Sequence, residues 1–191
     1  MQRLVDRIER DANYLGKGII KMDSFLNHQV DVELAEQMAE EFCMRFSELP
    51  AVTKVITVET SGIPVAVFVA RQLGVPMLFA RKSKSLLMQE NYYTAETVSR
   101  TRQTKTGLYI SGEYLTADDD ILFIDDFLAT GQSNIALMEI IRQSGAKVHG
   151  LGYIVEKPQE GGREKLAQFG VQIESLATVT WQGDALKVLV G

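Results

Sequence analysis

Two adjacent carboxylates, Asp125 and Asp126, lie between an apolar run and a turn of small and hydroxylated residues. The apolar run, residues 121–124, is typical of a short strand buried on both faces. The turn, residues 129–133, precedes apolar residues at helical spacing and would direct backbone N–H groups and a helix N-terminus at a phosphate. Carboxylates would repel that phosphate but suit sugar hydroxyls or a metal ion. The stretch therefore predicts a site for ribose 5-phosphate.

A plainer interpretation is an ordinary connection from a strand to a helix, in which two acids are simply solvated. That interpretation does not require this order of parts. The letters ILFIDDFLATGQS, residues 121–133, resemble the thirteen-residue signature of the type I phosphoribosyltransferases. The signature has four apolar residues, two acids, two apolar residues, a small residue, Thr, Gly, a variable position and Ser or Thr. Gln132 departs from many members of the family, which carry Gly there.

Helical and strand patterns alternate along the first half of the chain, which predicts an α/β fold with a parallel sheet and right-handed crossovers. Short-strand or irregular structure is expected at 19–29, and Asp31 can cap the helix at 31–49. The resemblance implies a central, mostly parallel twisted sheet flanked by helices. The other expected helices are 2–13, one ending at Leu73 before Gly74, one after the turn at 129–133, and 162–169; the strands are 55–58, 77–80, 93–101, 108–111, 121–124, 148–155, 171–176, 178–181 and 186–190.

A chain of 191 residues is large enough for one domain with its own core. We expect a single phosphoribosyltransferase domain over residues 1–191. Its core would span about 31–155. A small hood would come from the N- and C-terminal segments, about 14–30 and 156–191. The last two strands, which flank Gly183, would form a hairpin in this hood.

Composition excludes several classes of function. A net charge of −5 argues against a general nucleic-acid surface, and residues 2–13 are too short for a DNA-binding module. No apolar run approaches the roughly 20 residues of a membrane span, and the charged N-terminus is no signal peptide. The single Cys43 fits a reducing cytoplasm and excludes a cysteine-based zinc site. We expect a cytoplasmic protein without a membrane or nucleic-acid partner.

Residues 81–105 are basic within an acidic protein. They carry six basic and two acidic residues, whereas the rest of the chain carries 14 basic and 23 acidic ones. Such a stretch is often only a solvated hairpin. We favour a polyanion site, because the stretch lies between two segments that already suit phosphate. The tip around residues 86–91 would be a mobile loop able to close over a ligand.

A second resemblance extends along nearly the whole chain. The segments KMDSFLNHQ (21–29), ETSG (59–62), FARKSKSL (79–86) and IVEK (154–157) resemble the bacterial xanthine phosphoribosyltransferases, in the same order. Members transfer ribose 5-phosphate from phosphoribosyl diphosphate (PRPP) to xanthine, giving xanthosine monophosphate (XMP) and diphosphate. The resemblance implies purine salvage and a homodimer in which some basic residues reach across the interface. It also implies Mg²⁺ bound through PRPP, with no all-protein metal site and no organic cofactor.

The residues are suited to PRPP chemistry, in which positioning and electrostatic stabilisation do most of the work. Asp125 and Asp126 would hold the ribose hydroxyls and favour a cationic sugar. The resemblance also implies a strained peptide bond in the turn at 59–62, with the cis form as one option. The 5-phosphate would bind Ala129, Thr130, Gly131, Gln132 and Ser133; the diphosphate would bind Thr60, Ser61, Gly62, Arg81, Lys82 and Lys84.

Base selection depends on Lys157, which can only donate hydrogen bonds. It suits the 6-oxo group of xanthine, guanine or hypoxanthine and would meet the 6-amino group of adenine donor to donor, a mismatch of several kcal/mol. Asn27 is the candidate for the 2-oxo group, and Ile20 would add an apolar or backbone contact. Phe127 either packs on the purine or belongs to the core; both interpretations stay open.

Ala129 favours xanthine. Hypoxanthine–guanine relatives often carry an acid at this place, thought to handle the purine proton, and alanine cannot do this. Xanthine would then react as its anion, or water would take the proton. The alternatives are a guanine/hypoxanthine or adenine phosphoribosyltransferase, or a PRPP-binding purine regulator without catalysis.

Overall fold

A computed structural model describes residues 1–85, 91–98, 105–183 and 185–191. Its centre is a six-stranded sheet with the order β10-β9-β8-β7-β3-β4. All neighbouring strands are parallel except β10, which is antiparallel to β9. The predicted α/β fold with a mostly parallel sheet is therefore confirmed. The strands are β3 (Lys54–Val58), β4 (Met77–Ala80), β7 (Asp120–Leu128), β8 (Lys147–Glu156), β9 (Gln172–Gln182) and β10 (Ala185–Val190).

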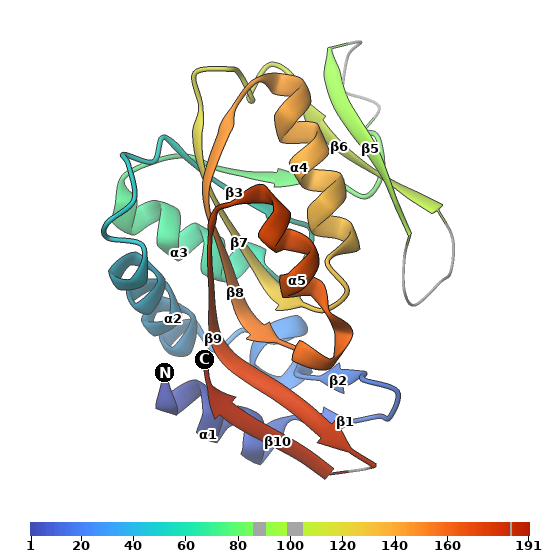
Figure 1. Cartoon of the computed structure of the whole chain (residues 1–191). Helices are drawn as coiled ribbons and strands as arrows, with labels where there is room; N and C mark the ends of the chain where they lie inside the picture. The colour runs from blue at the N-terminus through green and yellow to red at the C-terminus, as the bar shows by residue number, and fades with distance from the viewer. Residues whose placement is uncertain (86–90, 99–104, 184) are drawn as a thin grey trace.

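The central strand β7 is apolar because helices cover both faces of the sheet, so its side chains are buried on both sides (Figure 1). Leu122 and Ile124 face a core formed with α2 (Val32–Arg45) and α3 (Ile63–Leu73). Ile121 and Phe123 face a second core formed with α4 (Gln132–Ser144) and α5 (Gly162–Leu166). Asp31 accepts a hydrogen bond from the Leu34 N–H (3.1 Å) and caps α2 as predicted.

The prediction that the acids follow strand 121–124 is wrong, because Asp125 and Asp126 lie inside β7. On one side β7 pairs with β3 only as far as Ile56↔Phe123. On the other side it stays paired with β8 as far as Leu128↔Glu156. Strand β7 continues past Phe123 because β8 continues beside it. The acids therefore occupy a part of β7 that has one strand neighbour instead of two.

Further boundaries differ from the predictions, among them the following three. Helix α2 ends at Arg45 rather than near 49, and residues 46–48 form turns instead. The strands expected at 171–176 and 178–181 are one strand, β9, because β8 pairs with its first part and β10 with its second. The helix expected at 162–169 is α5 followed by a 3₁₀ turn, η3 (Ala167–Phe169).

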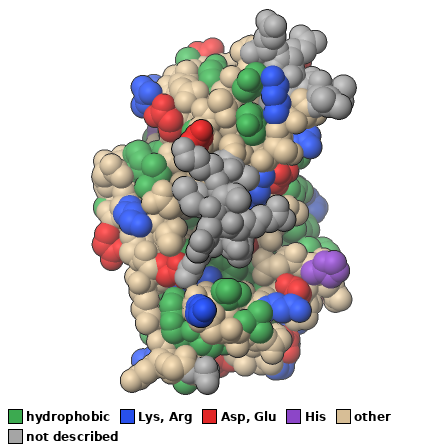
Figure 2. Space-filling model, turned by 90° about the vertical axis from the view of Figure 1, so that its right-hand side faces the viewer, with side chains coloured by type: hydrophobic (Ala, Val, Ile, Leu, Met, Phe, Trp, Pro, Cys, Tyr) green, Lys and Arg blue, Asp and Glu red, His purple; other side chains and the backbone are tan. Residues whose placement is uncertain are grey.

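The hairpin in the basic stretch consists of β5 (Tyr92–Val98) and β6 (Lys105–Ser111), which pair from Tyr92↔Ser111 to Val98↔Lys105. Their connection is therefore residues 99–104, not the predicted tip at 86–91. Residues 86–90 and 99–104 lie outside the described residues, so the predicted loop closure is not described either. On the face that Figure 2 presents, the acidic and basic side chains are interspersed instead of forming one patch.

The N- and C-terminal segments lie side by side at one end of the sheet (Figure 1). The N-terminal elements are α1 (Gln2–Asp11), β1 (Asn13–Tyr14), β2 (Ile20–Lys21) and a π-helical turn, η1 (Asp23–Asn27). Leu4, Val5 and Ile8 of α1 pack in the core with Val179 and Val188 of β9 and β10. Tyr14 also lies against Trp181, with ring centroids 6.0 Å apart. The division into core and hood stays a prediction.

Candidate active site

Each of the two acids of β7 accepts a hydrogen bond from the backbone N–H of the next residue. The Asp126 N–H donates to Asp125 Oδ1 (3.0 Å), and the Phe127 N–H donates to Asp126 Oδ1 (2.9 Å). Asp125 is buried, with 8% of its surface exposed, while Asp126 is partly buried. Each carboxylate thus has one oxygen fixed by a peptide N–H, and both lie where β7 has lost its β3 neighbour.

Burial favours the neutral form of both carboxyl groups. It is the main cause that raises the pKa of the Asp125 carboxyl well above its usual range, and the charge of Asp126 raises that pKa further. Burial also raises the pKa of Asp126, against the lowering effects of the Phe127 N–H and of the Lys82 and Lys157 charges. A ligand that brings positive charge or hydroxyl donors would favour the ionised form of both carboxyl groups.

The turn that follows β7 has a backbone that only glycine adopts readily. Gly131, with φ 75° and ψ 2°, is the N-cap of α4, and its carbonyl accepts from the Ile135 N–H (2.9 Å). Gln132 and Ser133 begin the helix. The Lys165 ammonium of α5 donates to the Thr130 carbonyl (3.1 Å). The turn therefore combines a left-handed glycine, a helix N-terminus and a nearby cation, which suits an anion.

The turn at 59–62 lies against the first acid. The Glu59–Thr60 peptide bond is cis, the option that the resemblance raised. A Cβ placed on Gly62 would lie 2.7 Å from Asp125 Oδ1 and closer still to Thr57 Oγ1. The Lys82 N–H donates to Glu59 Oε1 (2.5 Å). The structure thus places one predicted phosphate turn against Asp125, while the other follows directly on the strand that carries the acids.

The three predicted basic residues after β4 lie in different surroundings. The Lys82 charge acts on both acids. Arg81 ties β4 to β6, because its N–H and carbonyl both bond with Tyr109 (2.9 Å each). The Lys84 ammonium lies 4.0 Å from the centroid of the Tyr92 ring, in a cation–π contact with β5. Lys82 is the one of these three whose charge acts on the acids.

Lys157 and Asn27 contact two neighbouring residues of β7: Lys157 lies over Phe127, and Asn27 bonds to Asp126. Lys157 is 7% exposed, its ammonium donates to the Gly18 carbonyl (3.0 Å), and it lies 4.2 Å from the centroid of the Phe127 ring. Asn27 Nδ2 donates to Asp126 Oδ2 (3.1 Å), which leaves its second N–H for another acceptor. Ile20 is 7% exposed and belongs to the core, and Phe127 packs against the same core. Core packing is thus present for Phe127, and stacking on a purine stays a prediction.

Sequence reasoning missed four contributors to this region: Thr57, Gly18, Arg163 and Lys165. Thr57 had a signal, since it is the polar residue inside the apolar strand VITV and is fully buried. Gly18 had only the signal of two nearby glycines, Gly16 and Gly18; its φ of 74° and its close approach to Trp181 are seen only in the structure. Arg163 and Lys165 had none, since the contacts of Arg163 with Glu156 and Ser175 depend on how α5 packs on the sheet, and Lys165 contacts Thr130, 35 residues earlier.

A divalent cation fits the chemistry of the acid pair, because Mg²⁺ prefers carboxylate oxygens and phosphate ligands. Across the described parts of the chain, no group of three or more His, Cys, Asp or Glu side chains could enclose a metal. Asp125 and Asp126 would therefore share such a cation with a ligand. In the same described residues, no helix has the length and apolar character needed to cross a membrane.

The chain resembles curated proteins along most of its length. The chain is 46% identical over 179 residues to the xanthine phosphoribosyltransferase of Streptococcus agalactiae serotype Ia, covering 94% of this chain and 92% of that protein. It is 47% identical over 179 residues to the xanthine phosphoribosyltransferase of Latilactobacillus sakei, covering 94% and 91%. The alignments span more than nine tenths of both partners.

Solved structures share the fold at lower identity. Adenine phosphoribosyltransferase from Thermoanaerobacter pseudethanolicus has a TM-score of 0.74 at 20% identity and covers 90% of this chain and 98% of its own. Adenine phosphoribosyltransferase from Saccharomyces cerevisiae has a TM-score of 0.70 at 19% identity and covers 91% and 98%. The family profile described as the phosphoribosyl transferase domain matches residues 31–188. The chain therefore belongs to the phosphoribosyltransferase family.

Proposed function

We propose that this chain transfers the 5-phosphoribosyl group from PRPP to xanthine in purine salvage, giving XMP and diphosphate. Relatives called xanthine phosphoribosyltransferase, 45–47% identical over 94% of the chain, support this substrate. Three observations support the mechanism: the 59–62 turn lies against Asp125, the 129–133 turn follows the acids on the same strand, and the buried Lys157 lies over Phe127, the residue after Asp126. One sugar can then be held at both ends while its C1 faces the base.

Bond breaking at C1 is the step that the acids would assist. The C1–O bond breaks and its electron pair leaves with the diphosphate, so positive charge develops on the ribose. A ring nitrogen of the purine then forms the new bond to C1. Asp125 and Asp126 would accept hydrogen bonds from the ribose hydroxyls, and their negative charge would stabilise the cationic sugar. Burial, which raises the pKa of both carboxyls in the free protein, makes that stabilisation stronger.

The two ends of PRPP would bind the two turns. The 5-phosphate would accept hydrogen bonds from backbone N–H groups and hydroxyls of Ala129, Thr130, Gly131, Gln132 and Ser133. The diphosphate would bind Thr60, Ser61 and Gly62, with Arg81, Lys82 and Lys84 neutralising its charge. Mg²⁺ bound to the diphosphate would supply further charge neutralisation, and Asp125 and Asp126 are the protein groups suited to approach it.

The base would lie between Lys157, Asn27 and Phe127. Lys157 would donate to the 6-oxo group, and the second N–H of Asn27 would donate to the 2-oxo group that distinguishes xanthine from hypoxanthine. Phe127 would pack on the ring, and Ile20 would contribute an apolar or backbone contact. Since Ala129 cannot act as a base, xanthine would react as its anion or lose its proton to water.

The protein would act as a cytoplasmic homodimer in which part of the basic stretch reaches the neighbouring subunit's site. Xanthine and PRPP would be its small-molecule partners, without nucleic acid or membrane. The solved adenine phosphoribosyltransferases share the fold but, at 19–20% identity, do not favour adenine for this chain. A donor at Lys157 disfavours the 6-amino group of adenine. Guanine and hypoxanthine are the stronger competitors, because both carry a 6-oxo group.

A base-competition assay tests this proposal. Purified protein with PRPP and Mg²⁺ receives xanthine, guanine, hypoxanthine and adenine together, and nucleotides and diphosphate are quantified. We expect XMP to be the major product, formed in equal amount with diphosphate. Failure of xanthine to compete would refute the substrate assignment, and absence of released diphosphate with every base would favour the non-catalytic regulator.

A further inference from the structure

Residues 157–166, called here the 157–166 segment, contact the phosphate-type turn directly. Its Gly162 packs against the turn so closely that an added Cβ would meet the Ala129 carbonyl oxygen and lie 3.1 Å from the Gly131 nitrogen. Lys165 donates to the Thr130 carbonyl (3.1 Å). In a trans peptide the carbonyl and the next N–H point in opposite directions. Lys165 therefore fixes the peptide plane that also carries the Gly131 N–H.

The same segment begins at the base end of the site. Lys157 is bonded through its backbone N–H to the Leu128 carbonyl (2.8 Å), one residue before the turn. Its side chain reaches Gly18 and lies over Phe127. One short segment thus contacts the proposed binding sites of the purine and of the 5-phosphate. Its placement relative to the sheet sets both.

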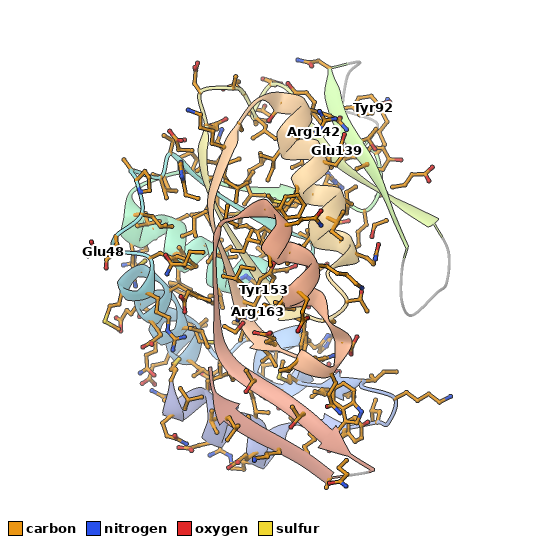
Figure 3. All side chains as sticks on the ribbon, in the orientation of Figure 1. Glu48, Tyr92, Glu139, Arg142, Tyr153 and Arg163 are labelled. Atoms are coloured by element: carbon orange, nitrogen blue, oxygen red, sulfur yellow. The ribbon has the colours of Figure 1, made fainter. Side chains whose placement is uncertain are left out.

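An ion pair fixes that placement. Arg163 of α5 donates through Nε to both carboxylate oxygens of Glu156, the last residue of β8 (2.9 and 3.0 Å), and through a terminal nitrogen to Oε2 (2.5 Å). Arg163 also donates to the Ile173 carbonyl and to Ser175 Oγ of β9 (3.0 and 3.1 Å). In Figure 3, Arg163 extends from α5 over the sheet, near Tyr153.

Glu156 is buried, with its side chain 5% exposed, so it depends on these partners. Burial opposes its ionisation, but the hydrogen bonds from Arg163 and Ser175 outweigh that effect and lower its pKa. The pair is ionised at neutral pH and forms the forked geometry that arginine and carboxylate favour. A point cation such as lysine could not span Glu156, Ile173 and Ser175 at once.

We infer that Arg163 is a positioning residue, which acts through the 157–166 segment to hold the purine-binding Lys157 and the phosphate-binding turn at 129–133 in mutual register. This inference rests on the proposed function for the identity of the two substrates. Arg163 itself touches neither substrate. Losing it would loosen both ends of the site at once, which a residue that merely supports the fold would not do.

The test is the Arg163→Met variant, assayed at 15 °C where it stays folded by circular dichroism. We expect kcat/KM to fall about tenfold or more for PRPP and for xanthine alike, and PRPP to bind about tenfold more weakly by calorimetry. Lys165→Met should weaken PRPP alone and leave the xanthine KM within twofold. A second variant, Glu156→Gln with Arg163→Met, removes the buried unpaired carboxylate and should show the same loss if Arg163→Met does not fold.

Arg45→Met is the matched control. Arg45 is also partly buried, pairs with Glu41 (2.8 Å) and donates to the carbonyl of the same Ser175 (2.9 Å), but it lies in α2, away from the 157–166 segment. We expect it to lower the melting temperature with both KM values within twofold of wild type. Folded Arg163 variants that keep wild-type kcat/KM and PRPP affinity would overturn the inference. A wild type that binds PRPP but makes no XMP would refute the proposed function, while the PRPP affinities would still test the phosphate end.

Discussion

Gly62→Ala tests the close approach of the 59–62 turn to the acid pair. Gly62 has an ordinary helical φ of −74°, so alanine introduces no backbone strain there, and only space is at issue. The new Cβ would lie 2.7 Å from Asp125 Oδ1, whereas ordinary contact begins near 3.4 Å. Since Thr57 Oγ1 would lie closer still, Thr57, Asp125 or the turn must move by at least about 0.7 Å.

This displacement is expected to lower both the stability and the activity of the protein. Overpacking a well-packed site costs about 1–3 kcal/mol, which in a chain of this size lowers the melting temperature by about 2–12 °C. A misplacement of about 1 Å at a reacting centre can cost about 100-fold in rate. We therefore expect kcat/KM for PRPP to fall about 10- to 100-fold, measured by steady-state XMP formation beside a thermal melt.

Gly74→Ala, at the other end of α3, is the control. Gly74 has φ 69° and open space around its Cα, so alanine costs about 1–2 kcal/mol of backbone strain without touching the site. It should lower the melting temperature comparably and leave kcat/KM unchanged. If Gly62→Ala kept kcat/KM within about threefold of wild type, the claim that this turn sets the position of Asp125 would be wrong.

Three further predictions concern the site residues themselves. Asp126→Asn should lower kcat about 100-fold with a modest loss of PRPP binding, because it removes charge that stabilises the cationic sugar; steady-state kinetics and calorimetry separate the two effects, and an unaltered kcat would exclude that role. Lys157→Gln should lower the preference for hypoxanthine over adenine about tenfold or more, since glutamine can also accept; an unchanged ratio of kcat/KM would remove Lys157 from the base site. Asp125→Asn should raise the melting temperature at pH 7.5 but not near pH 4. Folding raises the pKa of the Asp125 carboxyl, so this group destabilises the folded protein once the pH exceeds its unfolded pKa of about 4, and asparagine removes that cost. Equal melting temperatures of variant and wild type at pH 7.5 would contradict that account of Asp125.

Local patterns predicted the elements that depend on local chemistry. The apolar run of β7, the Asp31 cap of α2 and the Gly74 end of α3 are all present as predicted. These features follow from burial on two faces, from a side-chain acceptor and from a left-handed glycine. Each is encoded within a few residues, so it can be read without knowledge of the rest of the fold.

Strand ends were not predictable in this way, because strand length depends on partners. β7 continues through Asp125 and Asp126 since β8 continues beside it, and β9 stays unbroken since β8 and β10 pair with successive parts. The Arg163–Glu156 pair likewise depends on how α5 packs on the sheet, and the Lys165–Thr130 contact joins residues that are 35 positions apart. Fold class and site turns were therefore predictable, but the contacts that hold the site in register were not.

We propose that one sugar is held between the acid pair and the turn at 129–133. A crystal structure of the protein with XMP bound would test this arrangement. We expect 5-phosphate oxygens within hydrogen-bond distance of the Thr130 and Gly131 backbone N–H groups, and ribose hydroxyls on Asp125 and Asp126. Phosphate oxygens located away from that turn, with the ribose off both acids, would contradict it.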